Sequence, residues 1–261
     1  MLKIIRRRGA FLDNITVTNS AVEEKINEIF KDEQLTFTKE ELKKGYNSIY
    51  NRFVKRVIDI VLALILAIIL SPVYIVISLL IVIESGFPIL YRAARGGYKG
   101  KNFKICKFRS MVKDADKIGG GTTALNDARI TKVGSFLRKT KLDEITQLFN
   151  IIGGSMSFIG PRPELLRYTD NYDEIEKNIL NVRPGITDFS SLTFISLDEI
   201  VGAENADEVY EKYVLKKKNA LRLKYVKEVS FITDIKLFFK TVMKVINKAL
   251  SVIFKIFKKE K

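Results

Sequence analysis

Two adjacent carboxylates, Asp143 and Glu144, are the residues of this chain best suited to chemistry. The sequence has no histidine and a single cysteine, Cys106, so Ser-His and Cys-His nucleophile pairs and the usual zinc sites are excluded. One free carboxylate that attacks phosphorus and a second that holds a hard cation would suit phosphate chemistry. Acids in the first turn of a helix are also ordinary capping residues, kept ionised by the helix dipole, and both interpretations stay open.

Arginines on stiff loops are the natural partners of such carboxylates. Arg162 lies between two prolines in Gly160-Pro161-Arg162-Pro163, and Arg183 precedes Pro184 in a similar turn 21 residues later. Lys107 and Arg109 add positive charge at the end of a predicted strand. Rigidly held arginines suit bidentate recognition of phosphate, although each turn alone could be a surface turn.

The elements that must position these side chains follow from hydrophobic patterning. Residues 89–91 and 103–108 alternate like strands around Gly96, Gly97 and Gly100, which predicts a β-hairpin. Helical spacing over 131–138 and 142–152 predicts two helices, the second with Thr140 as its N-cap. We therefore expect the middle of the chain to be a compact α+β domain.

Residues 60–83 form a run of 24 residues without charge, more than the ~20 that a helix needs to cross a bilayer. Ser71 and Pro72 stand at its midpoint, and because proline removes a backbone donor, we expect a bend there. Basic residues flank both ends, and positive charge favours the cytoplasmic side. The flanks favour a re-entrant hairpin, while the pattern alone leaves a proline-kinked spanning helix open.

The C-terminal segment predicts a second contact with the membrane. Residues 212–261 carry 15 Lys and Arg against 3 acids. From residue 232 on, apolar side chains share one side of a helix (Ile235, Phe238, Phe239, Val242, Ile246, Ala249, Ile253, Ile256 and Phe257), and lysines recur on another (Lys236, Lys240, Lys244 and Lys248). Such a helix lies in the headgroup plane of anionic lipid. A helix that packs on a soluble core with a solvated lysine face is the alternative.

Composition narrows the functional class. The chain has 261 residues, a formal charge of +15 and an apolar fraction of 47%. This charge suggests a nucleic-acid-binding protein as one alternative, but most of it lies beside apolar faces, so we expect no nucleic-acid partner. Paired acids, several arginines and a membrane segment together indicate phosphate chemistry on a lipid-borne substrate.

The order of the motifs resembles the monotopic polyprenol-phosphate phosphoglycosyl transferases, the bacterial sugar transferase family. Seven motifs carry the resemblance over roughly 53–250: Lys55-Arg56-Val57-Ile58-Asp59, Ser71-Pro72 in the apolar run, Lys107 to Met111, Asn126 to Gly134, Leu142-Asp143-Glu144 with Gln147 to Asn150, Gly160 to Pro163, and Arg183 to Thr187.

The resemblance implies transfer of a sugar-1-phosphate from a UDP-sugar to undecaprenyl phosphate with release of UMP. It makes Asp143 the nucleophile of a covalent phosphosugar intermediate and Glu144, with Asp143, a ligand of Mg²⁺. It places Arg109, Arg138 and Arg162 around phosphates, with Lys107 and Arg183 as further substrate-binding residues, and gives Asp127 and Arg129 a less certain role. The Pro72 bend would keep the hairpin in one leaflet.

The implied organisation is an N-terminal extension (1–50), a re-entrant membrane helix (51–84), a catalytic domain (85–200) and basic amphipathic membrane-surface helices (201–261). The resemblance also implies a monotopic protein on the cytoplasmic face of the bacterial inner membrane, and a homo-oligomer stays open.

Two positions depart from the family pattern: Ile195 stands where relatives carry an arginine, and Ser155 where they often carry an acid. We expect an active enzyme with altered donor preference that initiates surface-glycan synthesis. The alternative is a scaffold for glycan-assembly enzymes.

Overall fold

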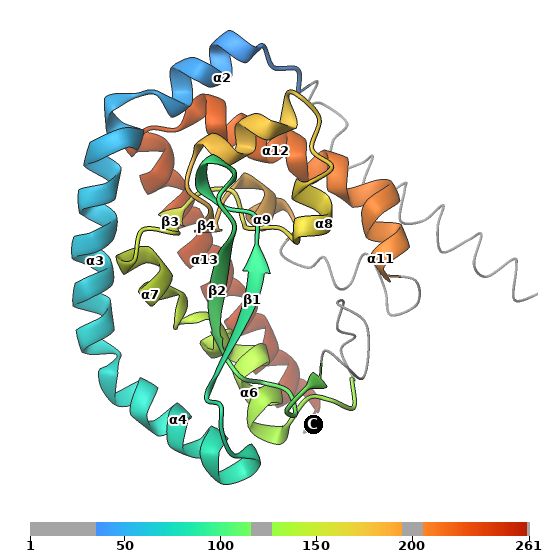
Figure 1. The fold of residues 1–261 in the computed structure, drawn as a ribbon. Coiled ribbons are helices and arrows are strands. Elements are labelled where there is room, and N and C mark those ends of the chain that lie inside the picture. Colours follow the sequence, from blue (N-terminus) through green and yellow to red (C-terminus); the bar gives the residue numbers. More distant parts are fainter. Residues whose placement is uncertain (1–34, 116–126, 195–205, 260–261) are drawn as a thin grey trace, which may run out of the picture.

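The computed structural model describes residues 35–115, 127–194 and 206–259 (Figure 1). Ile195 and most of the N-terminal extension lie outside these ranges. The described residues form an α+β structure, as expected, with helices around two small sheets. The short elements are α2 (Lys39–Tyr46), η1 (Tyr50–Val54), η2 (Tyr98–Gly100), α8 (Leu166–Thr169), η4 (Glu176–Asn181), α9 (Phe189–Thr193), α11 (Ala206–Val209) and η5 (Tyr210–Val214).

The apolar run forms two helices that meet at a sharp bend. α3 covers Lys55–Ile69 and α4 covers Ser71–Ser85, and the segments Tyr50–Ile69 and Ser71–Ser85 are bent by 61° (Figure 1). Pro72 lies in the first turn of α4, where a missing backbone donor costs no helical hydrogen bond. The predicted bend at Ser71 and Pro72 is confirmed.

Among the described residues, no helix is by itself long and apolar enough to cross a bilayer, whereas α3 and α4 together meet both criteria.

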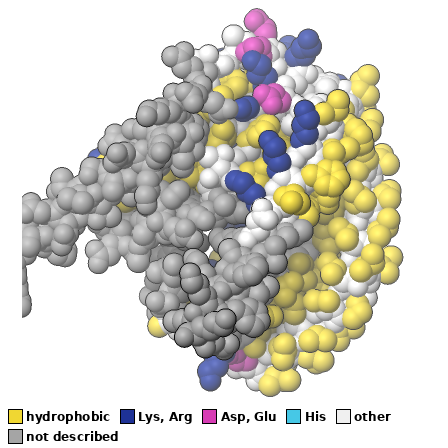
Figure 2. Space-filling view, turned by 180° about the vertical axis from the view of Figure 1, so that it is seen from behind, with side chains coloured by type: hydrophobic (Ala, Val, Ile, Leu, Met, Phe, Trp, Pro, Cys, Tyr) yellow, Lys and Arg dark blue, Asp and Glu magenta, His cyan; other side chains and the backbone are white. Residues whose placement is uncertain are grey.

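Each arm of the bent pair packs one face against the domain and leaves the other uncovered. Ala63 of α3 and Ile77 and Ile81 of α4 are buried. The uncovered face carries exposed apolar side chains: Val57, Val61, Leu62, Leu64, Ile65, Ile68, Ile69, Ile75, Val76, Leu79, Leu80 and Ile83. Figure 2 shows hydrophobic side chains gathered along the edge of the molecule that α3 and α4 form.

The predicted hairpin is confirmed. β1 (Leu90–Arg95) pairs antiparallel with β2 (Phe103–Phe108), from Leu90 opposite Phe108 to Arg95 opposite Phe103. Ile105, Cys106 and Phe108 turn inward, and the hairpin lies over the core in Figure 1. Lys107 in β2 is partly buried, and the following Arg109 is buried.

The two helices predicted after the hairpin differ in detail from the structure. α6 covers Lys132–Thr140, and the hydroxyl oxygen of Thr131 caps it by accepting from the Gly134 N–H (2.9 Å). The continuous helix expected over 142–152 is instead a 3₁₀ turn, η3 (Leu142–Glu144), followed by α7 (Gln147–Ile152). Lys141 adopts a left-handed conformation (φ 59°) that ends α6.

Thr140 is therefore not an N-cap, and that prediction is wrong. It is the last residue of α6, and its hydroxyl donates back to the Phe136 carbonyl (2.9 Å).

The two proline-containing turns belong to one parallel pair of strands. β3 (Ser157–Ile159) lies beside β4 (Gly185–Thr187), with Ser157 opposite Gly185. Glycine is required here, because a Cβ on Gly160 would lie 2.4 Å from the Arg183 carbonyl oxygen and one on Gly185 would lie 2.2 Å from the Gly160 nitrogen.

The C-terminal helices differ in how they pack. α12 (Leu215–Glu228) is embedded in the main core, where Leu223, Tyr225 and Val226 are buried. α13 (Phe231–Lys259) buries Asp234 and Leu237 but exposes the apolar side chains Phe231, Ile232, Ile235, Phe238, Phe239, Val242 and Met243. The described part of α13 thus leaves an apolar face without a protein partner among the described residues.

Candidate active site

Asp143 and Glu144 lie in η3, in the turn between α6 and α7 and next to the end of β2. Backbone contacts of β2 fix this turn: Thr146 donates its hydroxyl to the Cys106 carbonyl (3.0 Å), and Asn150 accepts from the Cys106 N–H (2.8 Å). The carboxylates are therefore held by a sheet edge and two short helical turns, which leave them little freedom to move.

The Asp143 side chain is buried and has no hydrogen-bond partner within the described part of the chain. The residue is 6% exposed, and its Oδ1 atom has no donor among the described residues. Burial raises the pKa of this carboxyl, and the neighbouring charge of Glu144 adds to the rise, while Lys107, Lys141 and Arg138 act against it. The expectation that placement in a first turn favours ionisation is outweighed here by burial.

Glu144 is held between two cations. Its Oε1 atom accepts from Lys107 Nζ (2.8 Å) and from Arg162 Nη2 (2.5 Å). Burial alone would raise the pKa of this carboxyl, but the charges of Arg162 and Lys107 outweigh it and hold the pKa well below its usual range. Glu144 is therefore a fixed negative charge beside the unpartnered Asp143.

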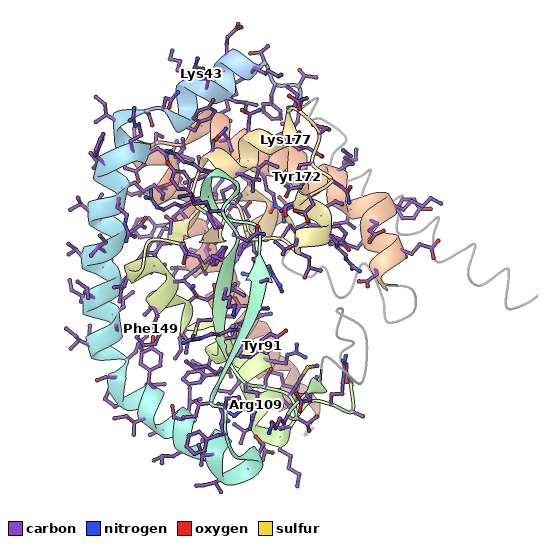
Figure 3. All side chains as sticks on the ribbon, in the orientation of Figure 1. Lys43, Tyr91, Arg109, Phe149, Tyr172 and Lys177 are labelled. Carbon is purple, nitrogen blue, oxygen red and sulfur yellow. The ribbon has the colours of Figure 1, made fainter. Side chains whose placement is uncertain are left out.

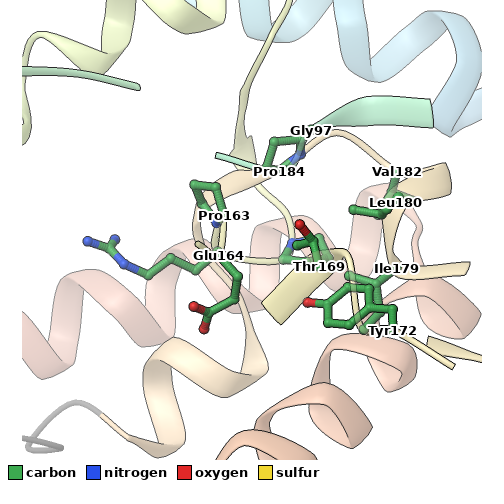
Figure 4. Close-up of a pocket in the computed structure, with 12 residues that line it drawn as sticks. Gly97, Pro163, Glu164, Thr169, Tyr172, Ile179, Leu180, Val182 and Pro184 are labelled. Carbon is green, nitrogen blue, oxygen red and sulfur yellow. The ribbon is translucent and has the colours of Figure 1, made fainter. Parts of the chain in front are cut away.

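Arg162 joins the proline loop to the carboxylates. Besides Glu144, it donates from Nη1 to the Ile186 carbonyl of β4 (3.2 Å). The loop also borders a small hollow that Gly97, Pro163, Glu164 and Tyr172 help to line (Figure 4). Neither Asp143 nor Glu144 lines this hollow, but Arg162 does, so the hollow adjoins the guanidinium that pairs with Glu144.

Both ends of the Arg162 loop are anchored to α12. Tyr225 donates its hydroxyl to the Ile159 carbonyl (3.1 Å) just before the loop. Arg222, fully buried, forms an ion pair with Glu164 just after it. Because Arg222 and Tyr225 are three positions apart on one helix, α12 fixes the loop at two points.

Arg109 and Arg138 both precede the carboxylate turn in the sequence. Arg109, labelled in Figure 3, is buried at the end of α4, where its Nη2 donates to the carbonyls of Ser85 (2.7 Å) and Gly86 (2.6 Å). Its Nε and Nη1 atoms have no partner among the described residues. Arg138, at the end of α6, lies close enough to Asp143 to lower the pKa of that carboxyl.

Arg183 and the Asp127–Arg129 pair make their contacts elsewhere. The Arg183 guanidinium stacks over the Tyr98 ring (4.6 Å), and its Nε donates to the Gly154 carbonyl (3.1 Å). Arg129 forms an ion pair with Asp127 (2.6 Å) in the segment that precedes α6. The structure thus brings together Asp143, Glu144, Lys107 and Arg162, with Arg138 nearby, and records no contact of Arg183 with them.

Three side chains near the site were not among the predicted site residues, although Gln147 belongs to one of the motifs that carry the family resemblance. Gln147 is fully buried, and neither amide atom has a partner among the described residues. Tyr74 of α4 donates to the Ile145 carbonyl (2.9 Å), and Glu84 accepts from the N–H groups of Lys132 and Val133 at the start of α6. For Gln147, the available signal in the sequence was a polar residue among the apolar positions of the helix predicted over 142–152. The contacts of Tyr74 and Glu84 join segments that are distant in the sequence, so no local pattern indicates them.

The two carboxylates suit a magnesium ion. The described residues contain no group of three or more acidic, histidine or cysteine ligands. Mg²⁺ is commonly bound through one or two carboxylates together with substrate phosphates and water. Asp143, with its unpartnered Oδ1, and Glu144 meet that requirement.

Comparison with known proteins places the chain in one family. The model of the bacterial sugar transferase family matches residues 50–248. The chain is 39% identical over 184 residues to the UDP-glucose:undecaprenyl-phosphate glucose-1-phosphate transferase of Escherichia coli (strain K12), covering 69% of this chain and 37% of that protein.

Two further relatives are matched over a little less than half of this chain. A putative undecaprenyl-phosphate N-acetylgalactosaminyl 1-phosphate transferase of Bacillus subtilis (strain 168) is 42% identical over 44% of this chain and 61% of its own length. The exopolysaccharide production protein ExoY of Rhizobium meliloti (strain 1021) is 37% identical over 45% of this chain and 58% of its own length. The matched part of the chain spans little more than a third of the Escherichia coli relative.

Proposed function

The chain belongs to the bacterial sugar transferase family, and from this we propose that it transfers a sugar-1-phosphate from a UDP-sugar to undecaprenyl phosphate. The observation that carries the proposal is the buried, unpartnered Asp143 carboxylate next to a Glu144 fixed by Lys107 and Arg162. A carboxylate without hydrogen-bond donors keeps its lone pairs for an incoming phosphorus atom.

In the first half-reaction, an Asp143 oxygen attacks the phosphorus that carries the sugar. The Asp143–phosphorus bond forms while the bond between this phosphorus and the bridging oxygen of the diphosphate breaks, and UMP leaves with that oxygen. Repulsion between the carboxylate and a phosphate, worth about 4 kcal/mol per charge pair at ~4 Å and a dielectric near 20, must be cancelled. Lys107, Arg138 and Arg162 supply positive charge for this purpose.

In the second half-reaction, the phosphate of undecaprenyl phosphate attacks the same phosphorus. The bond to Asp143 breaks, the aspartate is regenerated, and the sugar remains on the lipid through a diphosphate. Mg²⁺, when bound by Asp143 and Glu144, would neutralise phosphate charge. The soluble donor and the lipid acceptor must reach one atom, so the site has to lie at headgroup height.

The uncovered apolar faces of α3, α4 and α13 support that placement. We propose that α3 and α4 enter one leaflet as a re-entrant hairpin from the cytoplasmic face and that α13 lies along the membrane surface. Because about 20 apolar residues are needed to span a bilayer as a straight helix, two 15-residue helices bent by 61° fit an entry that stays in one leaflet.

Mass spectrometry of the full chain, incubated with UDP-sugars but without acceptor and measured intact and after proteolytic digestion, tests the chemistry. We expect a sugar-phosphate adduct on the peptide that contains Asp143 and release of UMP. Asp143→Asn should form no adduct and show no turnover, whereas Asp173→Asn, an exposed aspartate, should behave as the wild type. Normal turnover by Asp143→Asn would refute the proposal and favour the scaffold alternative.

A further inference from the structure

A hollow of about 150 Å³ opens at the start of α3, apart from the carboxylate pair. Six residues line it: Tyr46, Asn47, Arg52, Tyr98, Lys99 and Asn181. They come from the end of α2, from η1, from the β1–β2 turn and from η4. None of them contacts Asp143 or Glu144 among the described residues, so the hollow belongs to a different part of the molecule.

The lining carries positive charge that no carboxylate of the described residues balances. Arg52 and Lys99 form no ion pair with any carboxylate in the described parts of the chain, and their charged groups lie near aromatic rings, 5.7 Å from Phe53 and 5.4 Å from Tyr98. The Arg183 guanidinium stacks on the same Tyr98 ring at 4.6 Å. Several cations gathered around a polar hollow repel one another, and an anion in the hollow would relieve that repulsion.

Lys99 takes an unfavourable backbone conformation at this place. Its φ of 55° lies in the left-handed region, which is uncommon for residues other than glycine, asparagine and aspartate. Backbone strain of this kind is often found where a side chain serves a ligand.

An apolar strip begins directly beside the hollow. Ile49, Phe53 and Val57, the first two close to Arg52 in sequence, are 76%, 62% and 62% exposed. The strip continues into the uncovered face of α3. A ligand for this place therefore combines a negatively charged head with an apolar tail.

We propose that the hollow binds the phosphodiester headgroup of an anionic membrane phospholipid, such as phosphatidylglycerol, with its acyl chains along Ile49, Phe53 and Val57. Arg52 and Lys99 would pair with the phosphate, and Asn47, Asn181 and Tyr46 offer neutral hydrogen-bonding groups. A zwitterionic headgroup is disfavoured because the lining has no carboxylate for its ammonium group. Free phosphate would lack the contact with the apolar strip.

Native mass spectrometry of the delipidated full chain in neutral detergent tests this site. Phosphatidylglycerol, phosphatidylcholine of the same chain length and inorganic phosphate are titrated separately. The double variant Arg52→Gln/Lys99→Gln should raise the Kd of the first bound phosphatidylglycerol about tenfold. The matched control Lys43→Gln/Lys44→Gln removes the same charge from exposed positions of α2 outside the hollow (Figure 3 shows Lys43) and should change this Kd less than twofold.

Four results would overturn the proposal. Equal losses in the two double variants would mean that binding is diffuse attraction to basic surface. Binding of inorganic phosphate with the affinity of the lipid, or of phosphatidylcholine as tightly as phosphatidylglycerol, would exclude an anionic lipid as the occupant. A raised KM for undecaprenyl phosphate in the site variant, with unchanged phosphatidylglycerol binding, would identify the acceptor as the occupant instead. The lipid titration measures binding and not turnover, so it tests this site even if the chain shows no sugar-phosphate transfer.

Discussion

Arg162 is the residue whose replacement most directly tests how the site is built. Arg162→Gln removes the cation that lies 2.5 Å from Glu144 and keeps a side chain of similar shape in the loop. Hydrogen bonds to charged groups contribute about 1.5–3 kcal/mol. Since the Arg162 side chain is 34% exposed and Lys107 still holds the same oxygen, we take the lower part of this range, about 1.5–2 kcal/mol.

If this free energy acts on the transition state, kcat/KM for UMP release should fall roughly 10- to 30-fold. Arg167→Gln is the matched control, because Arg167 pairs with Asp207 at 3.0 Å with both side chains at least 40% exposed. Such a surface pair contributes little, about 0–1 kcal/mol, and lies away from the carboxylates.

The assay measures UMP release in detergent with donor and acceptor both varied, alongside thermal unfolding of each variant. A loss of less than threefold in Arg162→Gln, or an equal loss in Arg167→Gln, would refute the view that Arg162 fixes the charge of Glu144 for catalysis. A large loss of thermal stability in Arg162→Gln alone would assign the effect to folding instead.

The other predictions concern titration and packing. Because burial raises the pKa of Asp143, the acid limb of the profile of kcat/KM against pH should lie above the ordinary aspartate pKa of ~3.9. Lys107→Met should move this limb to higher pH, because the charge of Lys107 lowers the pKa of Asp143. An acid limb at or below pH ~3.9 would contradict this prediction. Despite burial, Arg222 and Lys218 lower the pKa of Glu164 from 4.5 to about 2, so its negative charge stabilises the fold above pH 4.5 by about 3 kcal/mol. This contribution should be lost as the pH falls toward 2, and it should be missing in Glu164→Gln. Thermal unfolding of both proteins across this pH range measures the difference. Gly134→Ala would place a Cβ 1.9 Å from the Ser110 carbonyl oxygen and should cost about 1–3 kcal/mol in unfolding free energy, against almost nothing for Ser135→Ala.

Local patterns in the sequence were sufficient for the hairpin and for the bend. Strand alternation around three glycines and a Ser71-Pro72 pair inside an apolar run are short-range signals, and β1, β2 and the start of α4 follow them. The capping role expected of Thr140 failed because the left-handed Lys141 ends α6 one residue later, and neither residue type indicates that conformation.

The interior of the site depends on contacts between distant segments. Motif spacing pointed to Asp143, Glu144 and Arg162, but the pairing of Glu144 with Lys107 across 37 positions is decided by how η3 packs on β2. The direction of the Asp143 pKa could not be read locally, because a first-turn acid favours ionisation and only the packed structure shows that the side chain is buried. Arg183 carried the same proline signal as Arg162 and yet stacks on Tyr98.

The two anchors of the Arg162 loop on α12 have a consequence for synthesis on the ribosome. The apolar run and both carboxylates leave the exit tunnel well before Arg222 and Tyr225 do, because these residues lie about 80 positions later in the chain. If α3 and α4 enter the membrane as proposed, the nascent protein can engage it while the Arg162 loop is still unanchored. Arg222 and Tyr225 complete the anchoring of this loop, so on the proposed function a chain that stalls before residue 222 would hold both carboxylates but would lack the anchors that position Arg162.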